Sequence, residues 1–89
     1  MTFPIRIEID HRYLHYKVEK IYDDGRIERY QINGRNGSII LESNRPLFRN
    51  KGLKKKRPEW NMIHGELKYR NYLRLFVDAI MDVVDKWIL

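Results

Sequence analysis

Cysteine is missing from all 89 residues of the chain. Its absence excludes disulfide bonds, thiolate metal sites, iron–sulfur clusters and cysteine nucleophiles. We expect no secretion signal either, because Met1-Thr2-Phe3-Pro4 leads straight into alternating isoleucine and charge instead of a continuous apolar run. We therefore expect a protein of a reducing compartment, the cytoplasm.

Long apolar runs are also absent, since no stretch reaches the roughly 18 consecutive apolar residues that a bilayer-spanning helix needs. We expect no association with a membrane. Turn-forming residues are few, at 5 Gly and 3 Pro, while 43% of the residues are hydrophobic and 34% are charged. That composition predicts a folded globular chain, and its length allows one domain over residues 1–89.

Motifs for catalysis are equally sparse. Ser38 lacks a nucleophile elbow, and the glycine-rich run before it lacks the Lys-Ser/Thr pair of a phosphate-binding loop. His11 and His15 are four positions apart on a predicted strand, so about 13 Å would separate them, too far to share one metal ion. We predict no enzymatic activity, no metal and no cofactor.

Hydrophobic alternation is what the N-terminal part does contain. Apolar and charged residues alternate in two successive segments, which predicts strands over about 3–10 and 13–22. The alternation slips near Lys20, so we predict a bulge there that also turns Ile21 inward. The inward positions are Phe3, Ile5, Ile7, Ile9, Leu14, Tyr16 and Val18.

Turn residues divide the next part into two more strands. Asp23-Asp24-Gly25 and the two Asn-Gly pairs within residues 33–37 predict hairpin turns, with strands at about 26–33 and 38–42. Residues 59–63 alternate again and form either a fifth strand or part of a loop. One face of this meander is apolar, and the other is expected to carry Arg6, Glu8, Lys17, Glu19, Glu28 and Gln31.

A long amphipathic helix is predicted over about 66–88, because its apolar residues recur with helical spacing. It would run roughly 33 Å, enough to cross a four-stranded sheet. We therefore predict the α+β class, with an antiparallel β-meander of four or five strands and one long C-terminal helix packed on its apolar face. The stripe consists of Tyr69, Tyr72, Leu73, Phe76, Val77, Ile80, Val83, Val84, Trp87 and Ile88.

The net charge of +6 is concentrated in one segment. Positions 45–57 hold seven cations and no acid, whereas the rest of the chain has 11 basic and 12 acidic residues, a net of −1. This basic loop, residues 44–58, is a candidate for binding nucleic acid or another polyanion, with Trp60 as a stacking residue; the alternative is a solvated loop. Its cations are Arg45, Arg49, Lys51, Lys54, Lys55, Lys56 and Arg57.

The helix also has apolar residues outside its main stripe. Leu75 and Met81 are the two, and they predict a homodimer interface through the helix, unless they are isolated exposed residues of the ordinary kind.

The predicted order of elements, an antiparallel sheet followed by a helix, resembles that of the single-stranded-DNA-binding transcriptional coactivators, which dimerise through that helix. The stretch from Trp60 to Gly65 followed by a periodic helix is also similar to small uncharacterised bacterial proteins. Neither resemblance transfers a functional residue. From the residues themselves we predict a nucleic-acid-binding accessory protein that uses the basic loop, or alternatively a protein-interaction module or homodimeric structural protein that acts through the helix; RNA, DNA and acidic protein partners stay open.

Overall fold

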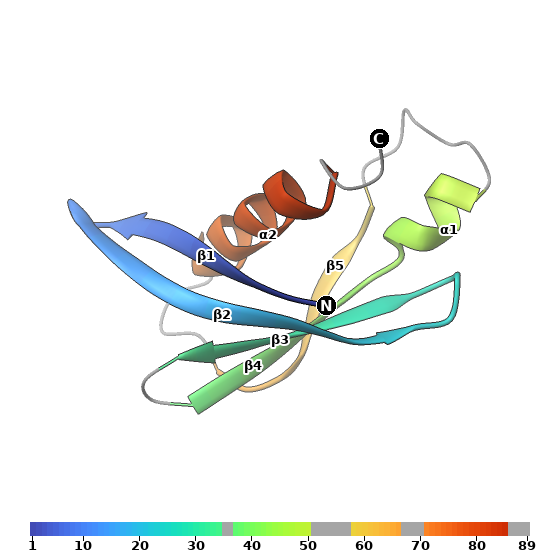
Figure 1. Ribbon diagram of the computed structural model, residues 1–89, viewed down its shortest axis with the longest axis horizontal. Coiled ribbons are helices and arrows are strands. Elements are labelled where there is room, and N and C mark those ends of the chain that lie inside the picture. The colour runs from blue at the N-terminus through green and yellow to red at the C-terminus, as the bar shows by residue number, and fades with distance from the viewer. Residues whose placement is uncertain (35–36, 51–57, 67–70, 86–89) are drawn as a thin grey trace.

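A computed structural model describes residues 1–34, 37–50, 58–66 and 71–85. Its strands β1 (Thr2–Ile9), β2 (Arg12–Asp23), β3 (Glu28–Gly34), β4 (Gly37–Ser43) and β5 (Trp60–His64) form one antiparallel sheet in chain order. The short helix α1 (Arg45–Asn50) lies at one end of the sheet, and α2 (Asn71–Val84) lies across one face (Figure 1). The predicted α+β architecture is confirmed, and residues 60–64 are the fifth strand.

Tight turns join the first three strands. Asp10 and His11 have φ angles of 52° and 63°, the positive values that both central residues of a type I′ hairpin need. The Asp23-Asp24-Gly25 turn also forms as predicted: Gly25 has a φ of 84°, and the Asp24 carboxylate accepts the backbone N–H of Ile27 at 2.9 Å. Side-chain carboxylates therefore fix the turn that carries the chain from β2 to β3.

The predicted bulge in β2 is present, because the pairing with β3 shifts register between Lys20 and Tyr22. The expectation that Ile21 turns inward is wrong, since this side chain is 42% exposed. A bulge residue leaves the ladder, and the residues beyond it change face. Lys20 precedes the bulge and lies on the inner face, opposite Tyr30. Asp23 follows the bulge and is brought to the same face, opposite Glu28.

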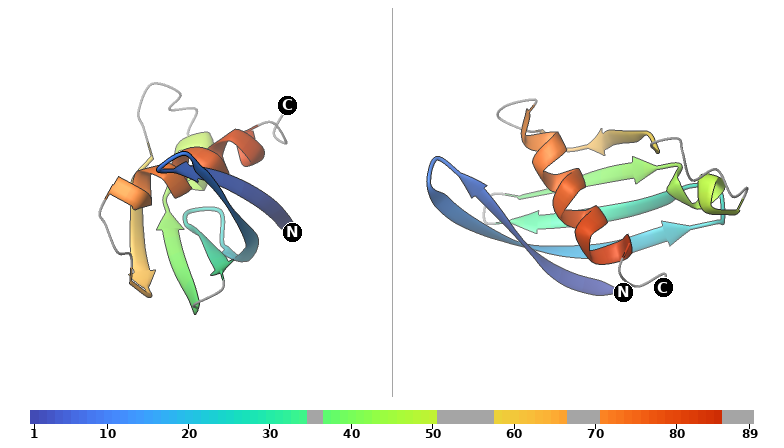
Figure 2. Two further views of the ribbon diagram at one scale, coloured as in Figure 1. Left: turned by 90° about the vertical axis from the view of Figure 1, so that its left-hand side faces the viewer. Right: turned by 90° about the horizontal axis from the view of Figure 1, so that it is seen from above.

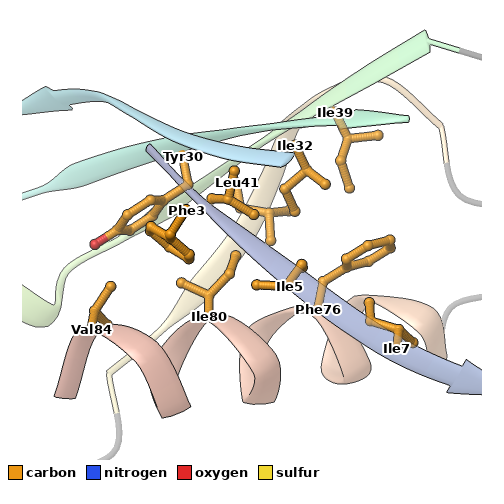
Figure 3. Packing of buried hydrophobic residues seen from close by; sticks show 11 residues of the cluster. Phe3, Ile5, Ile7, Tyr30, Ile32, Ile39, Leu41, Phe76, Ile80 and Val84 are labelled. Atoms are coloured by element: carbon orange, nitrogen blue, oxygen red, sulfur yellow. The ribbon is translucent and has the colours of Figure 1, made fainter. Parts of the chain in front are cut away.

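The core lies between the inner face of the sheet and α2, which crosses the strands obliquely (Figure 2). Figure 3 shows the helix side chains directed at those of the strands. Pro4 is accommodated because β1 is an edge strand. Leu14, predicted to be inward, is 38% exposed and lines an open cleft with Tyr72 and Gly65. The buried apolar residues are Phe3, Ile5, Ile7, Val18, Tyr30, Ile32, Ile39, Leu41, Phe76, Ile80 and Val84.

The described part of the C-terminal helix is shorter than predicted. It begins at Asn71 and not at Glu66, which lies outside any helix, and residues 67–70 and 86–89 lie outside the described residues. Gly65 precedes it with a φ of 92°, and a Cβ there would lie 2.6 Å from the Ile39 side chain. Only glycine satisfies both conditions, so Gly65 allows β5 to end close against β4.

We predict that Phe76→Ala costs roughly 3–5 kcal/mol of unfolding free energy, because it leaves a cavity in the core. Phe76 is 4% exposed and its ring meets that of Tyr16 edge to face at a centroid distance of 4.9 Å. Urea denaturation followed by circular dichroism measures the change. Asp78→Ala, at an exposed position of the same helix, is the control and should stay within about 0.5 kcal/mol. A similar cost for both substitutions would contradict this assignment of the helix face.

Candidate functional site: the base of the basic loop

The basic loop begins with a helical turn, which corrects the prediction that residues 44–58 are a loop throughout. Helix α1 spans Arg45–Asn50. Proline is tolerated in a first helical turn, where its missing N–H costs no intrahelical hydrogen bond. The hydroxyl of Ser43 accepts the backbone N–H of Arg45 at 3.1 Å, and the carbonyl of Asn44 accepts that of Leu47 at 3.1 Å. These two acceptors satisfy backbone N–H groups in the first turn of α1, which have no partner within the helix.

The two ends of the loop meet at its base. The N–H of Asn44 donates to the carbonyl of Glu59 at 3.3 Å, and the N–H of Glu59 donates to Oδ1 of Asn44 at 2.7 Å. The pair continues the ladder of β4 and β5, in which Ser43 is opposite Trp60. The chain from Arg45 to Pro58 is therefore an excursion from a closed base.

Arg45 anchors this excursion to the inside of the fold. Its Nε and Nη2 donate to the two carboxylate oxygens of Glu28 at 2.7 and 3.0 Å. The two side chains are 8% and 0% exposed. The sequence suggested Arg45 as a phosphate-binding cation, but the structure places its guanidinium on a buried carboxylate, so we leave it out of the cations offered to a ligand.

The expectation that Glu28 faces water is wrong. Glu28 alternates with Tyr30 and Ile32, all three of them buried, so it lies on the inner face of β3. Ile27, the apolar residue next to Glu28, has the opposite phase, but it precedes the strand and is only half-buried. The spacing of two between Glu28, Tyr30 and Ile32 indicates that Glu28 faces inward. Carboxylates are seldom buried, however, and this rule favoured the outer face.

Other polar groups complete the surroundings of Glu28. Nζ of Lys20 lies 3.4 Å from the Glu28 carboxylate and 2.6 Å from that of Asp23. Nη1 of Arg45 reaches Asp85, immediately after α2, at 3.4 Å. This charged cluster, Lys20, Asp23, Glu28, Arg45 and Asp85, has the buried pair of Glu28 and Arg45 at its centre and connects β2, β3, α1 and the end of α2.

Burial and charge shift the pKa of one group in the charged cluster, Arg45, and of one group beside it, Tyr30. Burial, reinforced by the negative charge of Glu28, raises the pKa of the Tyr30 phenol well above its ordinary value. Burial also opposes the charge of Arg45, but the hydrogen bonds and charge of Glu28 outweigh it, so the pKa of the Arg45 guanidinium is raised. Arg45 therefore stays charged, and the Tyr30 hydroxyl stays protonated beside it at neutral pH.

Trp60 lies at the other end of the loop and packs against the core. Its ring stacks on that of Tyr30, with centroids 5.8 Å apart and an interplanar angle of 27°. One face of the indole is therefore covered, and within the described ranges its buried Nε1 has no hydrogen-bond acceptor. Its role as a stacking residue for a ligand stays a prediction.

The remaining cations of the basic loop are known from the sequence alone. The side chain of Arg49 and all of Lys51, Lys54, Lys55, Lys56 and Arg57 lie outside the described residues. The described ranges hold nine Lys and Arg against twelve Asp and Glu, a net of −3. The rest of the chain holds nine Lys and Arg and no acid, so it carries the entire positive excess.

Leu75 and Met81, the predicted dimer residues, are both half-buried in the isolated chain. Leu75 packs against the core and lines a shallow cleft with Ile7 and Ala79. Part of its apolar surface is therefore accounted for within one molecule, and a homodimer stays a prediction.

The described residues contain no group of three His, Asp or Glu side chains arranged to hold a metal ion. Neither of the helices described, α1 or α2, has the length and apolar character to cross a membrane. Comparison with models of protein families, with curated proteins and with solved structures finds no match to this chain. The observations that bear on function are therefore the charge distribution and the geometry at the base of the basic loop.

We predict that Glu28→Gln costs about 3–5 kcal/mol of unfolding free energy, because it leaves the buried Arg45 without its counter-charge. Glu42→Gln is the matched control. Glu42 also accepts an arginine Nε, that of Arg29 at 2.8 Å, but the two side chains of this pair are 27% and 37% exposed. Exposed pairs contribute at most about 1 kcal/mol. Urea denaturation of both variants tests the difference, and equal costs would show that the buried pair has no special weight.

Proposed function

We propose that this chain is a non-enzymatic nucleic-acid-binding accessory protein that holds phosphates with the cations of the basic loop. The observation that carries the proposal is charge segregation. Lys51, Lys54, Lys55, Lys56 and Arg57 bring five positive charges into seven consecutive positions, while the described fold has a net charge of −3. A local excess of this kind attracts a polyanion to one place on the molecule.

The negative charge of the fold does not cancel this attraction. At physiological ionic strength, interactions between exposed charges are largely screened beyond about 8 Å. A phosphate within that distance of the loop cations therefore responds mainly to them. Acids elsewhere on the surface then disfavour other modes of binding and leave the loop as the preferred contact.

The geometry at the base of the basic loop also supports the proposal. Asn44 and Glu59 close the base, and Arg45 is fixed to Glu28 inside the fold. The cations therefore start from a fixed position on the sheet, and a ligand need not order the base of the loop to bind them. Ordering a free backbone costs roughly 1–2 kcal/mol per residue, so each residue already fixed lowers the cost of binding.

The test is the salt dependence of binding to a single-stranded oligonucleotide. If four loop cations contact phosphates, the logarithm of the affinity should fall with the logarithm of salt concentration at a slope of about −3, since each phosphate contributes about −0.7. Changing Lys54, Lys55, Lys56 and Arg57 together to Gln should flatten that slope. Fluorescence anisotropy of a labelled oligonucleotide measures it.

A matched control changes four other cations to Gln and lowers the net charge by the same amount. Arg12, Lys17, Arg26 and Arg74 are exposed and lie away from the loop in sequence. We expect this control to keep a slope of about −3. The proposal fails if the unmodified protein does not bind at about 50 mM salt, or if both sets of substitutions change the slope equally. The protein-interaction alternative would then lead.

A further inference from the structure

Two exposed tyrosines lie near opposite ends of β2 on the outer face of the sheet, the face away from α2. Each carries an arginine guanidinium over its ring: Arg6 lies 4.4 Å from the Tyr13 centroid, and Arg29 lies 4.8 Å from the Tyr22 centroid. Tyr13 is 56% exposed and Tyr22 is 41% exposed. The chain therefore presents two similar flat stacks, which differ in their surroundings.

The stack of Tyr22 and Arg29 is held in place by two acids. The Tyr22 hydroxyl donates to Oδ2 of Asp24 at 3.0 Å, and the Arg29 Nε donates to Oε2 of Glu42 at 2.8 Å. Asp24 is itself fixed, because its Oδ1 accepts the backbone N–H of Arg26 and of Ile27, each at 2.9 Å. The plane is thus preset, which reduces the ordering cost of stacking another ring on it.

This stack lies at the end of the sheet where the basic loop is rooted. Tyr22 pairs with Arg29, Arg29 with Glu42, and Glu42 with Asn61 of β5, two residues after Glu59. Three strand spacings of about 4.8 Å place Tyr22 about 14 Å from β5. Tyr13 lies nine residues back along β2, about 30 Å away. Tyr22 therefore lies near the closed base of the basic loop, whereas Tyr13 lies near the opposite end of the sheet.

We propose that Tyr22 and Arg29 form a base-stacking platform, and that the ligand of the basic loop is single-stranded nucleic acid. The inference rests on the proposed function and names the class of its substrate. Bases stack readily on aromatic rings and on guanidinium planes, but in a duplex each base already has neighbours on both faces. Glu42 pairs with Arg29 and balances its charge, so the platform contributes stacking and not phosphate contact.

The experiment compares Tyr22→Ala with Tyr13→Ala, which removes the same side chain from the other stack. The probes are an oligothymidine of about 12 nucleotides, and a duplex of the same length. Tyr22→Ala should weaken oligothymidine binding about 5- to 150-fold, the range for loss of one stacked base, and should leave duplex binding and the salt slope unchanged. Tyr13→Ala should change neither affinity by more than about twofold.

Tyr22→Phe separates the ring from its hydroxyl. It removes the hydrogen bond to Asp24 and keeps the stacking surface, so binding should stay within about threefold of the unmodified protein. Photocrosslinking of the unmodified protein to oligothymidine that carries 5-iodouracil gives a readout that does not depend on a variant. Peptide mapping should place the crosslink on Tyr22 and not on Tyr13.

The inference is overturned if Tyr22→Ala leaves oligothymidine binding intact, if it weakens duplex binding equally, or if the crosslink maps to Tyr13. Each of these results leaves the loop itself as a phosphate-binding segment, provided that its salt slope is still lost when Lys54, Lys55, Lys56 and Arg57 are changed to Gln. Absence of all binding would instead overturn the proposed function. The two failures are therefore distinguishable.

Discussion

A carboxylate with no exposed surface imposes the main constraint at the loop end of this fold. Glu28 stands on the inner face of β3, where an unpaired charge would lose its hydration without compensation. Arg45 supplies two hydrogen bonds and the opposite charge, and Lys20 lies close by. To deliver Arg45, the chain must start α1 immediately after β4. The bulge in β2 brings Asp23 to the same face as Lys20.

This constraint gives the protein two unlike regions. Along most of its length, α2 closes the sheet by apolar contact, with Phe76 and Ile80 against the strands. At the loop end, the closure is polar and directional, because Arg45 also reaches Asp85 just beyond α2. An apolar contact tolerates sliding, whereas a pair of hydrogen bonds to one carboxylate fixes both distance and direction. The polar region therefore determines where the basic loop begins.

The sequence was informative wherever a period or a turn residue decides the structure. Alternation gave the strands, the positive φ at Gly25 suited the predicted hairpin, and helical spacing placed Phe76 against the sheet. It failed at Glu28 and Ile21, which are exceptions to the rule that charge faces out and isoleucine faces in. In both cases, strand phase decided the direction: Glu28 alternates with Tyr30, and Ile21 is the extra residue of the bulge.

The candidate site was predictable in a different sense. The cluster of cations is a property of composition and needs no fold to be seen, but the burial of Arg45 depends on Glu28, seventeen residues earlier in the chain. No local pattern reports a contact of that separation. The pairing of Tyr22 with Arg29 follows from the turn, because Asp23 is opposite Glu28 and Tyr22 is the next residue of β2. The bulge at Ile21 shifts only the pairs beyond it, so that Lys20 is opposite Tyr30.

The closed base of the basic loop has a consequence for how this protein can change over evolutionary time. Because Asn44 meets Glu59 and Arg45 is fixed to Glu28, residues inserted or deleted in the part of the basic loop between Asn50 and Pro58 leave both of these contacts in place. Doubling the length of such a loop costs only about 0.6 kcal/mol in closure entropy. Mutation can therefore vary the length and charge of the segment while β4 and β5 keep their register. The fold can retain one framework while it acquires segments suited to different ligands.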